Sequence, residues 1–453
     1  MSEKLRLDSL ALRNFRCFRA LVEPVTFHKS LTVFVARNGG GKSAILDAVR
    51  ISVGTFTKRT SSYSQSNFRP SDASIDPCNL FKEQGAIFPI SVSASGCVDG
   101  KEVKWARSLG EGGRTTTKDA HVITDYGNRL SFGIKDGKGL DTSLPILAYY
   151  GTSRLWEASD TKKDKHPPVA QSRLEGYADA LTERSIFASV KSWLEYAYKV
   201  CDSKVESETD TGKRIVRQFT AVRNALDTVL SKEGWRNIHF NHTYMQMAVE
   251  RPADCGDETN NRPIVVPISW TSDGVLAVFA LVADIAYRCA RLNPQFGEDA
   301  CAMTEGIVMI DEIDLSLHPK WQQHILNDLI EVFPKIQFIV TTHSPQVISS
   351  IKRESLRILT PDGVVPFHRP TQGVEVSEIL RSVFGTDSTP QNLKIVDKLN
   401  RLVGLTSNGL GDTEEWKEIY DELVSYYGDE YGPLLGVVRH KDFLKRISKE
   451  RNA

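Results

Sequence analysis

Residues 306–312 constrain the fold more than any other part of this sequence. The run from Gly306 to Ile310 is apolar throughout and is followed directly by two carboxylates, Asp311 and Glu312. Such a run without alternation is typical of a parallel strand buried on both faces, and open α/β sheets bind ligands at the carboxyl ends of these strands. We therefore expect Asp311 to hold Mg²⁺, directly or through water, and Glu312 to polarise a water for attack on a phosphate. The alternative is a core strand that ends in two solvated carboxylates.

A second strand leads into a glycine-rich loop near the start of the chain. Residues 31–35 are apolar or β-branched, residues 36–43 read Ala-Arg-Asn-Gly-Gly-Gly-Lys-Ser, and apolar residues then recur at helical spacing. Strand, glycine loop and helix form the setting in which backbone N–H groups surround phosphate oxygens, with Lys42 on the terminal phosphates and the Ser43 hydroxyl on Mg²⁺. The residues expected to bind the nucleotide are Arg37, Asn38, Gly39, Gly40, Gly41, Lys42, Ser43 and Ala44.

The loop departs from the pattern G-x-x-x-x-G-K-[S/T] at one position, because Ala36 stands where the first glycine belongs. If that position needs a positive φ, alanine costs on the order of 1 kcal/mol. Two expectations stay open: an ATPase that turns over slowly, and a nucleotide-gated scaffold that hydrolyses little or no ATP. The third alternative is a chance glycine-rich turn, which the neighbouring strand and helix disfavour.

Two further motifs lie at the ends of predicted elements. His343 follows the apolar strand of residues 336–340, one strand beyond the two acids, and is expected to contact the γ-phosphate; a core histidine with internal partners is the alternative. Ser272, Asp273 and Gly274 open a long helix expected over about 274–292. Ser and Asp are good N-caps, and capping is compatible with anion binding because exposed N–H groups and the helix dipole attract an anion.

In their order along the chain, these motifs resemble the head of an ABC-type ATPase. The branch in question holds structural-maintenance, RecF-like and OLD-like proteins, and the resemblance covers about residues 5–360. The motifs are Asn14, Phe15 and Arg16 in an opening strand, the loop 36–43, residues 272–274, Asp311 with Glu312, residues 316–318, and His343.

The resemblance implies a role for each motif and two ligands, ATP and Mg²⁺. Residues 272–274 match the signature motif, which reaches nucleotide held by another subunit, and residues 316–318 match the D-loop. His343 matches the switch histidine and Arg16 a phosphate-contacting position. Gln65 is a candidate for the Q-loop glutamine by position only.

Three stretches within that branch resemble a compact group of bacterial defence ATPases: residues 149–156, 173–181 and 286–294. The group includes PtuA, the ATPase subunit of Septu-type anti-phage systems, which works with the separate HNH nuclease PtuB. PARIS and OLD-like ATPases share much of the pattern. The resemblance implies a sensor and regulatory subunit, a homo-oligomer built from head-to-head dimers, and a nuclease on another polypeptide.

The charge balance bears on a rival function, a RecF-like DNA-repair ATPase. Lys plus Arg and Asp plus Glu number 57 each, so the formal net charge is zero. Any DNA contact must therefore come from a local patch, for which Lys162, Lys163, Lys165 and His166 are the candidates. A solvated loop is the alternative for this cluster. The zero net charge counts against the repair function.

Other features of the composition bound the class of protein. The seven cysteines show no Cys-x-x-Cys pair, which disfavours zinc and suits reduced thiols. The first residues lack the apolar core of a signal peptide, and no apolar run reaches the length of a membrane span. We therefore expect a cytoplasmic protein without membrane contact.

The expected architecture is α/β, in two parts. Residues 1–360 form an ABC-type ATPase head with a mixed or parallel sheet, an antiparallel β lobe at about 85–135 and a helical insertion at about 177–235. Residues 361–453 form a helical region for assembly or partner docking. Sustained heptads are absent between the loop and residues 272–274, so no long coiled-coil arm is expected. The stretch after His343 is short for a TOPRIM nuclease domain and lacks a DxD pair of acids, so we expect no nuclease activity from this chain alone.

Overall fold

The computed structural model divides the chain into two compact units, Met1–Val374 and Glu375–Ala453. The division falls at 374/375 instead of the expected 360/361, because residues 363–366 still add a strand to a sheet of the first unit. The structure describes residues 4–21, 23–57, 66–75, 85–135, 141–155, 172–182, 187–251, 263–360 and 363–451.

A six-stranded sheet carries the glycine loop and the paired acids. Its strands follow the order β10-β14-β15-β4-β16-β17, and every pair is parallel except β16 with β17. The bounds are β4 (Leu31–Val35), β10 (Ile146–Tyr150), β14 (Gly306–Ile310), β15 (Ile336–Thr341), β16 (Leu356–Thr360) and β17 (Gly363–Pro366). Strands β4, β14 and β15 are buried along their whole length, as the unbroken apolar runs predict.

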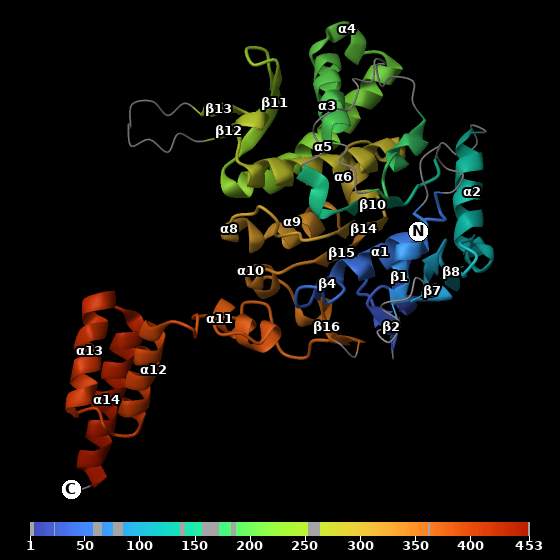
Figure 1. The fold of residues 1–453 in the computed structure, drawn as a ribbon. Coiled ribbons are helices and arrows are strands. Elements are labelled where there is room, and N and C mark those ends of the chain that lie inside the picture. The colour runs from blue at the N-terminus through green and yellow to red at the C-terminus, as the bar shows by residue number, and fades with distance from the viewer. Residues whose placement is uncertain are drawn as a thin grey trace. The chain divides into compact units, whose positions relative to one another are not determined.

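Because the strands are parallel, the segments that follow β4, β14 and β15 leave from the same edge of this sheet. The segment after β4 enters helix α1 (Lys42–Val53), which is mostly buried. The segments after β14 and β15 lead to α8 (Pro319–Gln322) and α10 (Pro345–Ser349), which lie on the same side of the molecule (Figure 1). The short α9 (Ile325–Val332) then returns the chain to β15. This edge therefore gathers the predicted motifs.

A second, antiparallel sheet forms the expected β lobe and includes the opening strand. Its order is β2-β1-β7-β8-β9, with β3 paired to β1. The bounds are β1 (Leu5–Phe15), β2 (Phe18–Ala20), β3 (Val25–Thr26), β7 (Ile90–Val98), β8 (Lys101–Leu109) and β9 (Thr115–Thr116); β5 (Ser74–Ile75) and β6 (Ala86–Ile87) form a separate pair.

The expectation of strand structure up to residue 135 is wrong for its last part. Helix α2 (His121–Lys135) occupies this stretch, and Ile123, Tyr126 and Leu130 are buried along one of its faces. The spacing of these three residues is helical, so packing of one face overrides the β-branched character of the first residues.

Helices make up most of the described part of the interval expected as the helical insertion, about 177–235. They are α3 (Phe187–Asp202), α4 (Lys204–Ser207) and α5 (Asp210–Leu230), followed by a small sheet of β11 (Arg236–Asn241), β12 (Gln246–Arg251) and β13 (Ile264–Pro267). Helix α6 (Asp273–Leu292) packs on α5, and α7 (Ala300–Met303) precedes β14.

Buried polar contacts fix α6 to the sheet. The Tyr150 hydroxyl at the end of β10 donates to Asp284 over 2.7 Å, and Arg288 donates to the same carboxylate over 3.0 Å. Burial, together with the carboxylate of Asp284, raises the pKa of Tyr150 well above its ordinary value, so the phenol stays a neutral donor. These contacts set the position of the helix that begins at the predicted signature residues.

The second unit is helical. It contains α11 (Val376–Ile379), α12 (Lys394–Ser407), α13 (Glu414–Tyr427) and α14 (Gly432–Arg451). Its small core consists of Leu402, Leu405, Trp416, Leu423, Leu434 and Val437. The Trp416 indole is fixed by a 2.7 Å hydrogen bond to Thr406. Among the helices that the structure describes, none is long and apolar enough to cross a membrane.

Candidate ATP site

The glycine loop between β4 and α1 adopts a backbone that only glycine fits well. Gly39 and Gly41 have φ values of 75° and 92°. A Cβ on Gly40 would lie 2.7 Å from the Ala36 methyl, and one on Gly41 would lie 2.7 Å from the Cys17 sulfur. Ala36 is not among the described residues with positive φ, so the condition for an alanine penalty at this position is not met.

This packing predicts a rescue experiment. Gly40→Ala should weaken ATP binding at least tenfold, because the new methyl meets Ala36 and the Arg37 carbonyl oxygen at 2.9 Å. Adding Ala36→Gly removes one of the two obstacles and should restore part of the affinity, whereas Ala36→Gly alone should change ATP affinity less than about threefold. Isothermal titration of the three variants measures this. Wild-type affinity in Gly40→Ala would contradict the packing.

Lys42 begins helix α1 and lies in the loop with little exposure. Its ammonium group donates to the Ala36 carbonyl over 3.4 Å, a long hydrogen bond that a phosphate oxygen could replace. Burial lowers the pKa of Lys42, and the carboxylates of Glu312, Asp311 and Asp314 oppose that shift. The ammonium group is therefore a poorly solvated cation that feels the negative charge of the acids that follow β14.

Ser43, Asp311 and Glu312 are joined through a buried threonine. The Ser43 hydroxyl donates to Asp311 over 2.7 Å, and the Thr341 hydroxyl donates to the other oxygen of the same carboxylate over 2.5 Å. The Glu312 amide in turn donates to the Thr341 hydroxyl over 2.8 Å. Thr341, on the neighbouring strand β15, thus contacts the carboxylate of Asp311 and the backbone of Glu312. Sequence reasoning missed it, although a polar residue at the end of an apolar strand was a usable signal.

The oxygen donors of Ser43 and Asp311 fit Mg²⁺. Hydroxyl and carboxylate oxygens are its preferred ligands, and Mg²⁺ in ATPases is held by few protein groups and otherwise by water and phosphate. The described residues contain no group of three or more His, Cys, Asp or Glu side chains that could hold a metal ion.

Glu312 and His343 lie in segments with constrained backbones. Glu312 has a φ of 48°, which is unusual for a residue other than glycine and is common at functional sites. Asp314, two residues later, accepts from the Thr342 hydroxyl over 2.5 Å and from the His343 amide over 3.3 Å. This carboxylate links the segment after β14 to the segment that carries His343. Asp314 and Thr342 were not among the predicted site residues.

Residues 272–274 begin α6 and lie against the segment after β14. Ser272 and Asp273 are exposed. Ser272 occupies the N-cap position, but its side chain accepts no capping hydrogen bond from the described helix. A Cβ on Gly274 would lie 2.7 Å from the Ser316 carbonyl oxygen, so this glycine permits the close approach. The first turn of α6 therefore lies next to residues 316–318, the predicted D-loop.

Arg16 contacts helix α1 through carboxylates. It forms ion pairs with Asp47 on α1 at 2.6 Å and with Asp72 at 2.9 Å. Burial would lower its pKa, but Asp47 and Asp72 outweigh that effect and raise it, so Arg16 is firmly charged. Gln65 and the cluster Lys162, Lys163, Lys165 and His166 lie outside the described residues.

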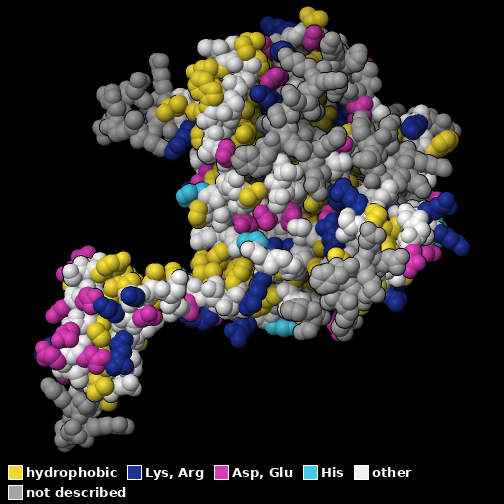
Figure 2. Space-filling model, in the orientation of Figure 1, with side chains coloured by type: hydrophobic (Ala, Val, Ile, Leu, Met, Phe, Trp, Pro, Cys, Tyr) yellow, Lys and Arg dark blue, Asp and Glu magenta, His cyan; other side chains and the backbone are white. Residues whose placement is uncertain are grey.

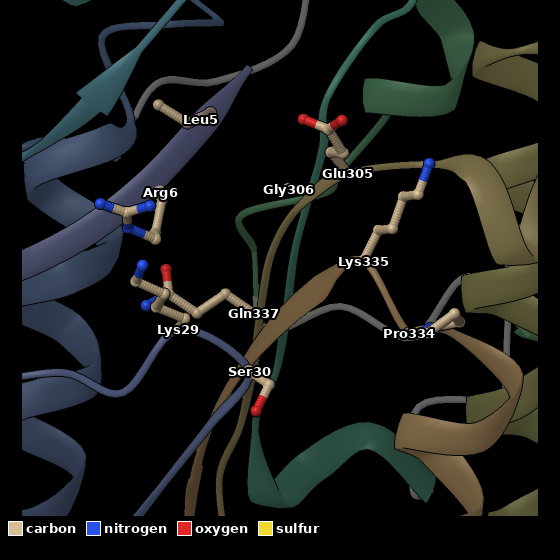
Figure 3. A pocket seen from close by; sticks show the side chains of 9 residues that line it. All are labelled: Leu5, Arg6, Lys29, Ser30, Glu305, Gly306, Pro334, Lys335 and Gln337. Carbon is tan, nitrogen blue, oxygen red and sulfur yellow. The ribbon is translucent and has the colours of Figure 1, made fainter. Parts of the chain in front are cut away.

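A cavity of about 470 Å³ lies at the opposite edge of the sheet, where β14 and β15 begin. Figure 3 shows its lining, which includes Arg6, Lys29, Glu305, Lys335 and Gln337. Among the described residues, no predicted site residue lines it. The motifs and this cavity therefore occupy opposite ends of the same strands.

The parallel sheet, the glycine loop and the acids at the end of β14 define a P-loop ATPase of ABC type. The chain belongs to the AAA_21 family, described as "AAA domain, putative AbiEii toxin, Type IV TA system", whose sequence pattern matches residues 31–349.

Similar proteins come from several systems. The chain is 23% identical to "Retron Ec83 probable ATPase" of Escherichia coli, over 94% of this chain and 85% of that protein. It is 35% identical to "Septu protein PtuA" of Bacillus mycoides (strain KBAB4), over 34% of this chain and 22% of that protein. The SMC head domain from Thermotoga maritima aligns with a TM-score of 0.44 and 16% identity, covering 81% of this chain and 100% of that chain.

Proposed function

We propose that this protein is the ATP-binding and ATP-hydrolysing sensor and regulatory subunit of a bacterial anti-phage complex, acting with a separate HNH-type nuclease. The observation that carries the ATPase part is the set Ser43, Asp311, Thr341 and Glu312, joined by short hydrogen bonds beside the buried cation Lys42. The similarity to a retron ATPase and to PtuA supports the defence setting.

Each residue has a definite task in this proposal. The backbone N–H groups of residues 37–43 bind the phosphates of ATP, and Lys42 neutralises charge on the terminal ones. Ser43 and Asp311 would hold Mg²⁺, which would supply positive charge to offset that of the phosphates. Glu312 accepts a proton from the attacking water, and His343 reads the γ-phosphate.

Hydrolysis in this proposal needs two copies of the chain paired head to head. The α6 N-terminus is exposed and uncapped within the described structure, so its N–H groups and dipole are available to an anion. A second copy that brings its nucleotide to this helix would exclude water from the γ-phosphate and strengthen every charge interaction there.

The alternative function for the same site is a nucleotide-gated scaffold that hydrolyses little or no ATP. The sequence feature that favoured this alternative was Ala36. Because Ala36 does not adopt a positive φ, that support is weakened. Steady-state phosphate release by the purified chain separates the two: turnover that depends on Glu312 favours the ATPase, and ATP binding without turnover favours the scaffold. Direct DNA binding with a steep salt dependence would instead favour a DNA-repair role.

The defence role is tested by phage plating on cells that carry this gene with its neighbouring reading frame. We expect protection only when that neighbour encodes an HNH protein and both are present, and we expect Lys42→Ala to abolish it. Full protection by the Lys42→Ala variant would contradict a regulatory role for ATP, and full protection without the neighbour would contradict the separate nuclease.

A further inference from the structure

Three large apolar side chains are exposed together at the turn between β11 and β12 and just before α6. Trp270 is 66% exposed, Met245 65% and Tyr244 40%. The rings of Tyr244 and Trp270 meet edge to face with centroids 5.1 Å apart. We call Tyr244, Met245 and Trp270 the hairpin patch; Figure 2 shows hydrophobic side chains on the surface over this small sheet. Tryptophan is rarely so exposed without a partner.

The hairpin patch is held in place by polar contacts. The side-chain oxygen of Asn241 accepts from the amides of Thr243 and Tyr244 over 2.9 and 3.1 Å, which closes the turn. The Ser269 hydroxyl donates to Gln246 over 2.8 Å and joins the turn to the segment that carries Trp270. A fixed set of aromatic side chains loses little conformational entropy on binding, which suits a protein interface.

The position of the hairpin patch indicates its occupant. Trp270 lies two residues before Ser272, at the exposed start of α6. A second copy that presents its nucleotide to this helix must also cover the surface beside it. Near its start, the phosphate loop of the second copy carries an exposed cation, Arg37, and tryptophan and tyrosine faces bind guanidinium groups well. Apolar anchors next to a polar centre are typical of specific interfaces.

We propose that the hairpin patch is a contact surface for a second copy of this chain, which covers Trp270 and Tyr244 when two ATP-bound heads pair. This proposal rests on the proposed function, since it assumes that α6 meets a neighbour's nucleotide. It goes beyond the signature residues, because it assigns part of the pairing energy to side chains that touch neither nucleotide nor metal.

The test measures ATP-dependent pairing by analytical ultracentrifugation, in a Glu312→Gln background that retains ATP. Trp270→Glu and Tyr244→Ala should each raise the dimer dissociation constant tenfold or more, while ATP affinity measured at nanomolar protein stays within about twofold. Phe132→Glu is the matched control, because Phe132 on α2 is equally exposed, at 69%, and should change neither quantity. Circular dichroism confirms that each variant is folded.

Each outcome decides a different point. Pairing of the parent with unchanged dissociation constants in both patch variants would overturn the hairpin-patch proposal and leave the ATPase function standing. A parent that stays monomeric with ATP would overturn the composite site itself, and the patch proposal with it. Equal loss of pairing in Phe132→Glu would show a general effect of surface charge and would also overturn the proposal.

Discussion

Lys42→Ala is expected to lose measurable ATP binding while the protein remains folded. Lys42 is the buried cation of the phosphate loop, and a charge-assisted hydrogen bond is worth about 1.5–3 kcal/mol. Loss of two such bonds to the terminal phosphates corresponds to an affinity loss of about 10²–10⁴-fold. Because burial lowers the pKa of Lys42, the ammonium group loses its proton at a lower pH than an ordinary lysine. Wild-type ATP affinity should therefore fall as the pH rises through the alkaline range.

Lys29→Ala is the matched control for this variant. Lys29 is an exposed lysine that lines the cavity at the opposite edge of the same sheet. Its removal should leave ATP affinity unchanged. Isothermal titration with Mg²⁺–ATP measures both variants, and near-wild-type affinity in Lys42→Ala would remove the assignment of the phosphate loop.

Glu312→Gln is expected to bind ATP normally and to lose about 10²–10⁴-fold in turnover, the range that general-base catalysis contributes. Glutamine keeps the shape of the side chain and cannot accept the proton of the attacking water. The backbone at Glu312 has positive φ and is held by the amide hydrogen bond to Thr341, which the substitution preserves. The variant should therefore retain ATP and remain in the ATP-dependent assembly state.

The control for Glu312→Gln is the same exchange at the other end of β14. Glu305 immediately precedes this strand and accepts a hydrogen bond from the Lys4 amide. Glu305→Gln should leave single-turnover hydrolysis unchanged. If Glu312→Gln hydrolyses ATP as fast as the parent, another residue must position the water.

The contact between Ser43 and Asp311 could be predicted from the sequence. The apolar runs of β4 and β14 identified two buried parallel strands, and parallel strands end at the same edge of a sheet. The Ser43 hydroxyl indeed reaches Asp311, although the two residues are far apart in the chain. The same rule placed the segment with His343 at this edge.

The polar side chain of Thr341 at the end of an apolar strand was a usable signal, but its hydrogen-bond partners could not be predicted, because they depend on the register between two strands. Ile310 pairs with Val340, and this pairing places the Thr341 hydroxyl where it donates to the Asp311 carboxylate and accepts from the Glu312 amide. Strand register follows from packing across the whole sheet and cannot be deduced from the sequence of either strand alone. The ion pairs of Arg16 could not be predicted either, because Asp47 and Asp72 come from separate segments that only the folded chain brings together.

Helix α2 shows where local preference gave the wrong answer. The residues Val122, Ile123 and Thr124 favour strands, yet Ile123 is buried as part of a helical face. Tertiary packing therefore determined the helical conformation of residues 121–135. Nor could the sequence say whose nucleotide meets residues 272–274, because distance along the chain does not distinguish one subunit from two.

The central claim, a nucleotide site shared between two copies, is tested most directly by mixing two inactive variants. Lys42→Ala removes ATP binding from one subunit, and Ser272→Arg blocks the start of α6 in the other. A mixed dimer then contains one intact site, formed by the phosphate loop of the Ser272→Arg subunit and α6 of the Lys42→Ala subunit. We expect the mixture to recover part of the ATP hydrolysis that each variant lacks alone. Equal inactivity of the mixture and of each variant, with mixed dimers shown to form by mass spectrometry, would contradict the shared site.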